Sequence, residues 1–376
     1  MMRSKAVLFF ILVSAALGAS QPKQGHRQEG VTGVSGFDVC ADGSRLHLLL
    51  GRVDASTAPA RLEHLGSGDG GQTWSAASRV DGGGAAPYRA QAGDVAVAAY
   101  GKGVLALWTA KGPGPYGSGP LSAAASGDGG RTWKKAPSPS DDGTKFGRRF
   151  SDLAVDAAGG LHAVWLDRRD KAQLRYAAAP KLGGKWRAQT VIDPDTCECC
   201  WNTVIADGKK IHALYRAKGP RDMAVATLAG SSWKIAVAGD FNWQFNGCPH
   251  VGGGLAADKD GKLHTVVWTG KEGAVGVYHV GSGAPVRLGS KDARFADIAA
   301  TRSGRLAAVW SANDEDGQTV YAALSGDGGR TWGEPKRLSS AEAQAAHPRI
   351  LPIADGFRVF WLETRGALRD WASAAL

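Results

Sequence analysis

The sequence predicts an all-β protein, a β-propeller built from four-stranded antiparallel blades, and three observations predict it. The chain of 376 residues contains 53 Gly and 13 Trp but only 3 Met, a composition typical of short strands and tight turns and not of helix bundles. One eight-residue motif occurs three times, at distances that fit a repeat of roughly 50 residues. A second pattern, an apolar hairpin, is found seven times along the chain.

The first element, residues 1–20, has the pattern of a secretory signal peptide. Arg3 and Lys5 precede an apolar run from Ala6 to Leu17, and small residues follow it. The run is too short to cross a bilayer. We therefore expect cleavage, a single mature domain over residues 21–376, and a secreted protein, most simply one of the bacterial periplasm. No later segment is apolar over about 18 residues, so we expect no transmembrane segment in the mature chain.

The charge of the chain is positive but dispersed. The 45 Lys and Arg exceed the 35 Asp and Glu by 10, and removal of Arg3 and Lys5 leaves 43 − 35 = +8. Because no Lys/Arg run is longer than two residues, we expect no nucleic acid partner. An anionic small molecule or glycan fits this charge better. No feature of the sequence identifies a partner protein.

The hairpins supply the predicted blades. Each combines an apolar strand, a turn with Asp or Gly, and a second apolar strand. The clearest copies cover residues 153–165, 204–215 and 255–268, and weaker copies lie near 37–50, 94–108, 296–310 and 348–362. This count favours seven blades, with six as the alternative. The last unit, about 346–375, shows only three strands, and we expect the segment before Phe37 to supply the missing outer strand and close the ring.

The eight-residue motif occupies residues 67–74, 126–133 and 325–332. It resembles the Asp-box, or BNR repeat, of the sialidase-like β-propeller superfamily, since S-x-D-x-G-x-T-W is matched at every position in all three copies. The resemblance implies the fold and leaves the activity open. A carboxylate that accepts turn N–H groups and a Trp that packs on a neighbouring sheet indicate a structural role, with a calcium or catalytic role as the alternative. The residues concerned are Asp69, Asp128, Asp327, Trp74, Trp133 and Trp332.

Several arginines fall in the loops that a propeller places around one end of its central channel. Sialidases hold a substrate carboxylate with an arginine triad, so the resemblance implies an anion-binding role for these residues; pairing with local carbonyls or carboxylates is the alternative. The candidates are Arg89, Arg149, Arg294 and Arg349.

A sialidase also needs a Tyr nucleophile activated by Glu, and an Asp acid/base. The spacing dictates no such pair, and the F/Y-R-I-P motif of sialidases is absent. The candidate catalytic residues are Tyr88, Tyr215, Asp167, Glu198 and Glu363.

Four of the five cysteines belong to two short segments, Cys197-Glu-Cys-Cys200 and Gly247-Cys-Pro-His250. They resemble the C-x-C-C and G-C-P motifs of a secreted subgroup of Asp-box proteins. The two segments enter the inner strands of adjacent blades, so we expect Cys197, Cys199, Cys200, Cys248 and His250 to meet at the channel mouth. One alternative is a disulfide, for example between Cys200 and Cys248. The others are a copper or zinc site and a redox-active Cys199–Cys200 pair. Cys40 is expected to be a buried free thiol.

These observations lead to one principal hypothesis and two alternatives. The principal hypothesis is a non-classical propeller that binds a ligand or a metal at its Cys-rich channel mouth. The first alternative is an exo-α-sialidase-like glycoside hydrolase that acts on anionic glycans. The second is a platform for protein interaction without a small ligand.

Overall fold

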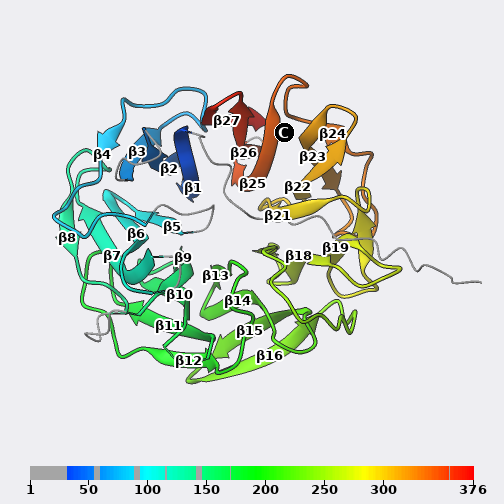
Figure 1. The fold of residues 1–376 in the computed structure, drawn as a ribbon, viewed down its shortest axis with the longest axis horizontal. Helices are drawn as coiled ribbons and strands as arrows, with labels where there is room; N and C mark the ends of the chain where they lie inside the picture. The colour runs from blue at the N-terminus through cyan, green and yellow to red at the C-terminus, as the bar shows by residue number, and fades with distance from the viewer. Residues whose placement is uncertain are drawn as a thin grey trace, which may run out of the picture.

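The computed structural model describes residues 32–54, 60–88, 94–114, 117–140, 146–169, 171–354 and 356–376. These residues form strands and contain no α-helix. The strands are grouped in sheets that radiate from a common centre (Figure 1). The predicted all-β propeller fold is therefore confirmed. Within the described ranges, no helix has the length and hydrophobicity needed to cross a membrane.

The strands follow one another as meanders around the ring. The first contains β1 (Thr32–Asp42), β2 (Arg45–Val53), β3 (Arg61–Ser67) and β4 (Ser78–Arg79). The second contains β5 (Val95–Tyr100), β6 (Gly103–Lys111), β7 (Ser118–Ser126) and β8 (Lys134–Ala136). The third contains β9 (Arg148–Val155), β10 (Leu161–Asp167), β11 (Gln173–Ala179) and β12 (Thr190–Asp193). The fourth contains β13 (Thr203–Asp207), β14 (Lys210–Arg216), β15 (Met223–Ala229) and β16 (Ser232–Ala238).

The remaining meanders complete the circle. The fifth contains β17 (Gly254–Ala257), β18 (Leu263–Thr269), β19 (Gly276–Val280) and β20 (Val286–Leu288). The sixth contains β21 (Arg294–Ala300), β22 (Leu306–Asp314), β23 (Gly317–Ser325) and β24 (Lys336–Arg337). The last contains only β25 (Gln344–Ile353), β26 (Gly356–Arg365) and β27 (Leu368–Ala375).

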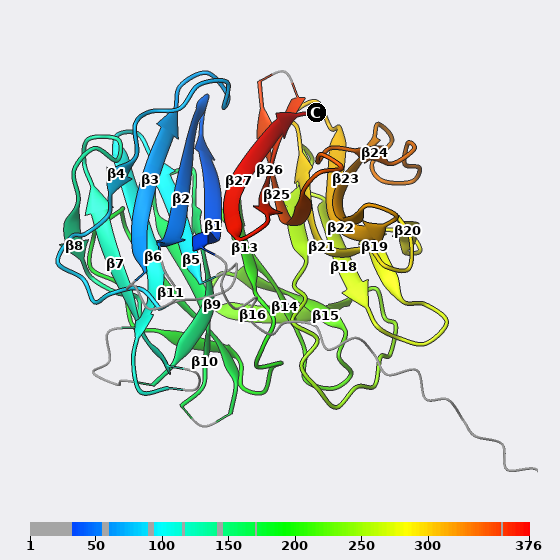
Figure 2. The ribbon, with the colours of Figure 1, turned by 45° about the horizontal axis from the view of Figure 1, so that its top comes forward.

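The first and last meanders join into one seven-stranded sheet. The starts of β1 and β27 pair in parallel, Thr32 with Leu368 and Gly33 with Arg369, and the two strands lie side by side in Figure 2. Residues before Phe37 thus reach the last meander, as expected, but as the start of β1 and not as a separate outer strand. The first and last meanders are not separate sheets, so the sheet topology alone does not give the number of blades. We interpret the six four-stranded meanders and the one three-stranded meander as seven blades.

The core lies between neighbouring sheets, where small and large apolar side chains alternate along the second and third strands. Trp165 of β10 is fully buried against Leu105 and Leu121 of the preceding sheet. Trp310 of β22 is packed in the same way beside Trp268 of β18. Burial of such rings between sheets is the main stabilising contribution to a fold whose sheets share few backbone hydrogen bonds.

Near the axis, side chains of the innermost strands connect one sheet to the next. A buried carboxylate accepts a hydrogen bond from a backbone N–H of the following inner strand at three places around the ring. These bonds run from Val97 to Asp38 (2.8 Å), from Val204 to Asp152 (2.7 Å) and from Ile350 to Asp297 (3.1 Å). The same contact thus joins three different pairs of neighbouring inner strands.

Three inner strands also contain a bulge at equivalent positions. Phe150, Phe295 and His347 have φ angles of 56°, 53° and 56°, each where the register with the next strand shifts. Non-glycine residues rarely adopt this left-handed conformation. A bulge turns the side chain away from its regular alternation, and Phe295 and His347 consequently face the central cavity.

The three Asp-box motifs form similar hairpin turns. In the second motif, Asp128 accepts hydrogen bonds from the backbone N–H groups of Arg131 and Thr132 and from the hydroxyls of Thr132 and Ser126, at 2.7–3.0 Å. Asp69 and Asp327 accept equivalent bonds in their own turns.

The tryptophan of each motif packs against the preceding meander. The ring of Trp133 lies 5.4 Å from that of His64 on β3, and the ring of Trp332 lies 5.2 Å from that of His279 on β19. Trp74 packs against Trp371 on β27, at 5.3 Å. These contacts support the structural role expected for the motifs.

We predict that Asp128→Ala lowers the unfolding temperature at neutral pH, because the turn loses four hydrogen bonds. Those bonds depress the pKa of Asp128 below its ordinary value, so the stability they contribute is present above the pKa of the unfolded chain and is lost as the pH falls through the folded value. Thermal unfolding measured from pH 7 down to pH 2 should show the two proteins converging in acid. Asp260→Ala, at an exposed Lys–Asp pair, is the control and should behave as wild type throughout.

Candidate functional site

The loop from β12 to β13 buries three cysteines at one place. Thr196 forms a β-bridge with Ala217, and the N–H of Cys197 donates to the carbonyl of Arg216 at 3.0 Å. These contacts hold the loop against the end of β14. Cys197, Cys199 and Cys200 are 1%, 6% and 1% exposed, and together they form a small buried cluster, called here the thiol cluster.

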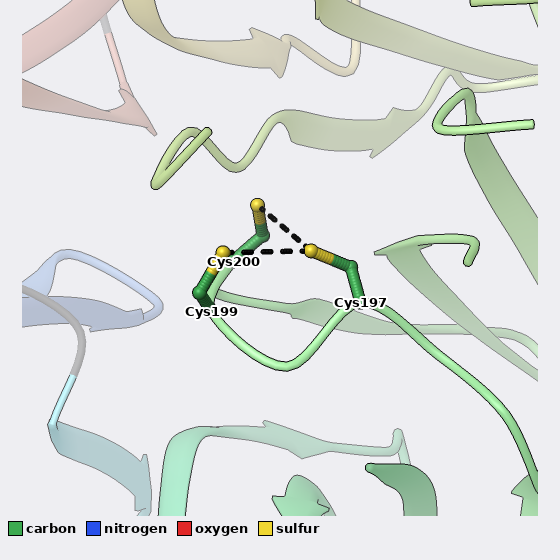
Figure 3. Close-up of side chains that lie close together, drawn as sticks. All are labelled: Cys197, Cys199 and Cys200. Atoms are coloured by element: carbon green, nitrogen blue, oxygen red, sulfur yellow. Dashed lines mark hydrogen bonds between the residues drawn. The ribbon is translucent and has the colours of Figure 1, made fainter. Parts of the chain in front are cut away.

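The sulfur atoms of the thiol cluster point toward one another (Figure 3). The Sγ of Cys197 lies 3.5 Å from that of Cys199 and 3.7 Å from that of Cys200, and all three sulfurs lie within 4.8 Å of one another. A disulfide bond measures about 2.05 Å, and all five cysteines of the chain are free in this structure. Metal–sulfur bonds of about 2.3 Å in a tetrahedron place sulfurs about 3.8 Å apart, which is close to the observed spacing.

The loop from β16 to β17 brings a fourth thiol to the edge of the cluster. Cys248 is exposed, and its thiol contacts that of Cys199. Its Sγ also lies 3.8 Å from Oε1 of Glu198. Glu198 in turn binds the ammonium group of Lys218 at 3.0 Å. The two Cys segments of the sequence therefore meet.

Positive charge surrounds the thiol cluster. Hydrogen bonds with the thiols of Cys199 and Cys200, and to a smaller extent the positive charge of Arg221, hold the pKa of Cys197 well below its ordinary value. Burial raises the pKa of Cys200 to about 12, and hydrogen bonding to Cys197 raises that of Cys199. The cluster thus stabilises a thiolate on Cys197 through hydrogen bonds with the two neighbouring thiols. A stabilised thiolate favours reactivity or metal binding.

Two further predicted members of the site have separate surroundings. His250 is in a left-handed conformation (φ 54°), and its Nδ1 donates to the carbonyl of Cys248 at 2.9 Å. No contact between its ring and a sulfur occurs within the described ranges. Cys40 lies on β1 outside the cluster and is a free thiol as expected, but it is half-buried and not fully buried. Desolvation raises its thiol pKa well above the ordinary value.

The predicted arginines do not form a triad among the described residues. Arg149 binds Asp94 at 2.8 Å, and Arg294 lies 4.7 Å above the ring of Trp268. Arg349 lines the central cavity and binds Asp38 at 3.2 Å. Arg89 lies outside the described residues. The alternative interpretation of the sequence, pairing with a nearby carboxylate, describes Arg149 and Arg349, whereas the neighbour of Arg294 is an indole.

The candidate catalytic residues are distributed over several places. The buried Tyr215 hydroxyl donates to Asp193 at 2.7 Å, and burial together with this carboxylate raises its pKa, which opposes nucleophilic activation. Asp167 is fully buried between Arg148 and Arg169, at 3.2 and 2.6 Å.

The other two candidates, Glu363 and Tyr88, have separate partners. Glu363 accepts a hydrogen bond from the indole of Trp361 at 2.9 Å. Tyr88 lies under the guanidinium of Arg149, at 5.5 Å.

A feature absent from the sequence analysis is the aromatic cap over the axis. Trp201, which follows Cys200 directly, stacks on Phe295 at 5.6 Å and meets the edge of His347 at 5.7 Å. Residues from β21 and β25 thus contact a loop of the fourth meander across the channel. Gly252 permits this position of the indole, since a Cβ there would lie 2.2 Å from the ring. The sequence feature that could have predicted this cap is an aromatic or imidazole residue near the start of two inner strands, in Arg294-Phe295 and His347-Pro348.

Comparison with known proteins identifies the fold. No family model and no curated protein matches the sequence. An ulvan lyase structure of polysaccharide lyase family PL25 is 11% identical, with a TM-score of 0.60 over 92% of this chain and 94% of that one. The β-propeller domain of the trilobed protease from Pyrococcus furiosus is 9% identical, with a TM-score of 0.53 over 91% and 95% of the two chains. An α-L-arabinanase from Penicillium chrysogenum is 12% identical, with a TM-score of 0.50 over 91% and 93%.

These similarities are consistent with the sialidase-like β-propeller fold that the Asp-box motifs indicated. At identities of 9–12% they show the fold and no activity. The features that distinguish this chain are therefore its own side chains, first the thiol cluster and then the centre of the channel.

We predict that Arg221→Met raises the pH at which the Cys197 thiolate forms, because an opposite charge near a thiolate lowers its pKa by about 1–3 units. Ultraviolet titration of thiolate absorbance on reduced, metal-free protein measures this pH. Arg221→Lys keeps the charge and should titrate close to wild type. Equal titration curves for the Met and Lys variants would show that the guanidinium charge has no influence on the cluster.

Proposed function

We propose that this protein is an exported β-propeller that binds one thiophilic metal ion, zinc or copper(I), in the thiol cluster at its channel mouth. The observation that supports this most strongly is the spacing of Cys197, Cys199 and Cys200, whose sulfurs lie within 4.8 Å of one another without a bond between them. Thiolates are soft ligands that select such ions over calcium or magnesium.

Charge supports the same assignment. Metal binding requires deprotonated thiols, and a buried cluster of thiolates is unfavourable unless cations compensate it. Arg221 and Arg216 act electrostatically on Cys197 and Cys200 respectively. Arg216 is itself fully buried and is held by the carbonyls of Val251 and Trp268 at 3.1 and 3.0 Å. These bonds hold the guanidinium charge of Arg216 in place before a metal ion binds.

The number of sulfur ligands determines whether the site suits zinc or copper(I) better. A fourth sulfur from Cys248 would complete a tetrahedron of the kind zinc prefers. Three buried sulfurs alone suit copper(I), for which soft ligands are selective. Cys248 is exposed and belongs to a different loop, so it is the ligand on which this choice depends. The competing disulfide and redox hypotheses require a bond of about 2.05 Å between cysteines that are free in this structure.

Export is part of the proposal. The signal-peptide pattern of residues 1–20, which lie outside the described part of the chain, supports secretion to an oxidising compartment, most simply the periplasm. Free thiols there tend to form disulfides, and a bound metal would protect them.

The glycosidase alternative has less support. The ulvan lyase structure is described as bound to -[GlcA(1-4)Rha3S]-, so an anionic glycan ligand for this propeller is plausible. The geometry of Tyr215 and the separate partners of Arg149, Arg294 and Arg349 offer no assembled sialidase site. Among the described residues, the protein-interaction alternative has in its favour the exposed apolar side chains of Ile235 and Val237 on the edge strand β16.

We predict that protein purified after export contains about one equivalent of zinc or copper per chain, and that Cys199→Ser lowers this content at least tenfold. Elemental analysis with thiol titration measures it. Cys40→Ser removes a thiol outside the cluster and should retain the metal. Cys248→Ser should weaken zinc more than copper(I) if the fourth sulfur completes a tetrahedron.

The same preparations test the alternatives. A metal-free protein with four oxidised cysteines would establish the disulfide hypothesis in place of the metal site. Hydrolysis of a fluorogenic sialoside that is lost on Arg349→Ala and Arg294→Ala would instead favour the enzyme.

A further inference from the structure

The centre of the ring contains a small polar cavity apart from the thiol cluster. Its volume is about 40 Å³, room for an ion and a few waters but not for a sugar ring. The aromatic cap of Trp201, Phe295 and His347 covers it. Asp38, Asp152, Ser151 and Arg349 are among the polar residues of its wall.

The charge around this cavity is unbalanced. Asp38, Asp152 and Asp297 are 5%, 7% and 7% exposed. Arg349 binds Asp38 at 3.2 Å and lies 3.8 Å from Asp297, and it is the single cation among the described lining residues. When all are ionised, the lining carboxylates Asp38 and Asp152, the neighbouring Asp297 and Arg349 sum to −3 + 1 = −2, of which −2 + 1 = −1 belongs to the cavity lining itself. His347 adds no positive charge at neutral pH, because burial lowers its pKa to about 4.

A buried net charge of this size needs compensation, because an uncompensated ion is costly to remove from water. Asp38 accepts hydrogen bonds from Val97, Val39 and Arg349, and Asp152 accepts them from Val204 and Leu153. These bonds satisfy only part of the capacity of the two carboxylates, since each ionised carboxylate has about four acceptor sites. Lone pairs therefore remain for a further partner. Either protons or a cation can fill that role.

An independent observation concerns Ser151, the neighbour of Asp152 on β9. Ser151 is 4% exposed, lines the cavity, and its Oγ has no hydrogen-bond partner in this structure. A buried hydroxyl without a hydrogen-bond partner destabilises a protein. A hydroxyl oxygen that lines the same cavity as two carboxylates is a suitable ligand for a hard cation.

We propose that the central cavity binds one Ca²⁺ ion through the carboxylates of Asp38 and Asp152 and the hydroxyl of Ser151, with water at the remaining positions. Calcium is favoured over magnesium because its coordination tolerates irregular geometry, whereas magnesium demands a near-ideal octahedron that ligands on rigid inner strands do not readily provide. A divalent ion also balances the charge of −2. The site selects a different class of ion from the thiol cluster, because thiolates select soft ions and carboxylates select hard ones.

The decisive experiment titrates calcium-depleted mature protein with CaCl₂ by calorimetry and follows thermal unfolding. We expect one Ca²⁺ per chain, a raised unfolding temperature, and a weaker response to MgCl₂. Ser151→Ala should bind calcium at least tenfold more weakly, and Asp152→Asn, whose amide oxygen can still accept from Val204, should lose binding. Asp207→Asn, at the far end of β13, is the matched control and should bind as wild type.

The serine variant also gives the result that would overturn the proposal. If nothing occupies the cavity, Ser151→Ala removes an unsatisfied hydroxyl and raises the unfolding temperature equally with and without CaCl₂. That outcome, or an absence of calorimetric binding to a folded wild-type protein, refutes the calcium site whatever the metal content of the thiol cluster.

A pH series distinguishes proton uptake from calcium binding. Burial, with the nearby charge of Asp38, raises the pKa of Asp152 to about 7. Without calcium, the folded protein keeps a proton that the unfolded chain has released, so stability should fall as the pH rises from about 4 to about 7. The other charged or titratable groups that act on this carboxyl are Asp38, Arg349 and Cys40, and His347 lines the same cavity. Saturating calcium should flatten this fall, and a fall of equal size with and without calcium would mean that protons alone balance the charge.

Discussion

Side-chain hydrogen bonds at the axis are the constraint on which the rest of this structure depends. Five of the sheets are separate units with no strand pairing between them, so the ring needs other bonds where the inner strands converge. The carboxylates of Asp38, Asp152 and Asp297 provide them. Aspartate has the reach to join a neighbouring backbone N–H without widening the channel. The same choice concentrates negative charge at the centre of the molecule, where water is scarce.

Both candidate sites follow from this architecture. Loops from outer to inner strands pass over one end of the ring, so residues from separate meanders meet there. The loops before β13 and β17 bring Cys248 to the edge of the thiol cluster, and β21 and β25 place Phe295 and His347 against Trp201. Arginines serve different purposes in this setting. Arg216 and Arg221 influence the thiols, whereas Arg349 offsets carboxylates at the axis.

The fold could be predicted because its signals are local and repeated. Apolar hairpins and Asp-box motifs recur at blade spacing, and the strands of the meanders lie where those patterns indicated. The meeting of the two Cys segments also follows from repeat position alone.

The sequence analysis missed the features that depend on side-chain direction. Asp38, Asp152 and Asp297 occupy ordinary strand positions, and nothing in their local sequence shows that bulges and radial packing turn them to one axis. The expected arginine triad was an extrapolation from loop position. Arg149 and Arg294 each have a nearer partner, a carboxylate and an indole.

A consequence arises from the peptide bond between Cys200 and Trp201. One residue contributes a sulfur to the thiol cluster and the next contributes the largest ring of the cap above the axial cavity. A shift of this loop that moves the Cys200 sulfur therefore also moves the Trp201 ring. If both proposed sites bind their ions, the factor by which the soft ion changes the affinity for the hard ion equals the factor by which the hard ion changes the affinity for the soft ion.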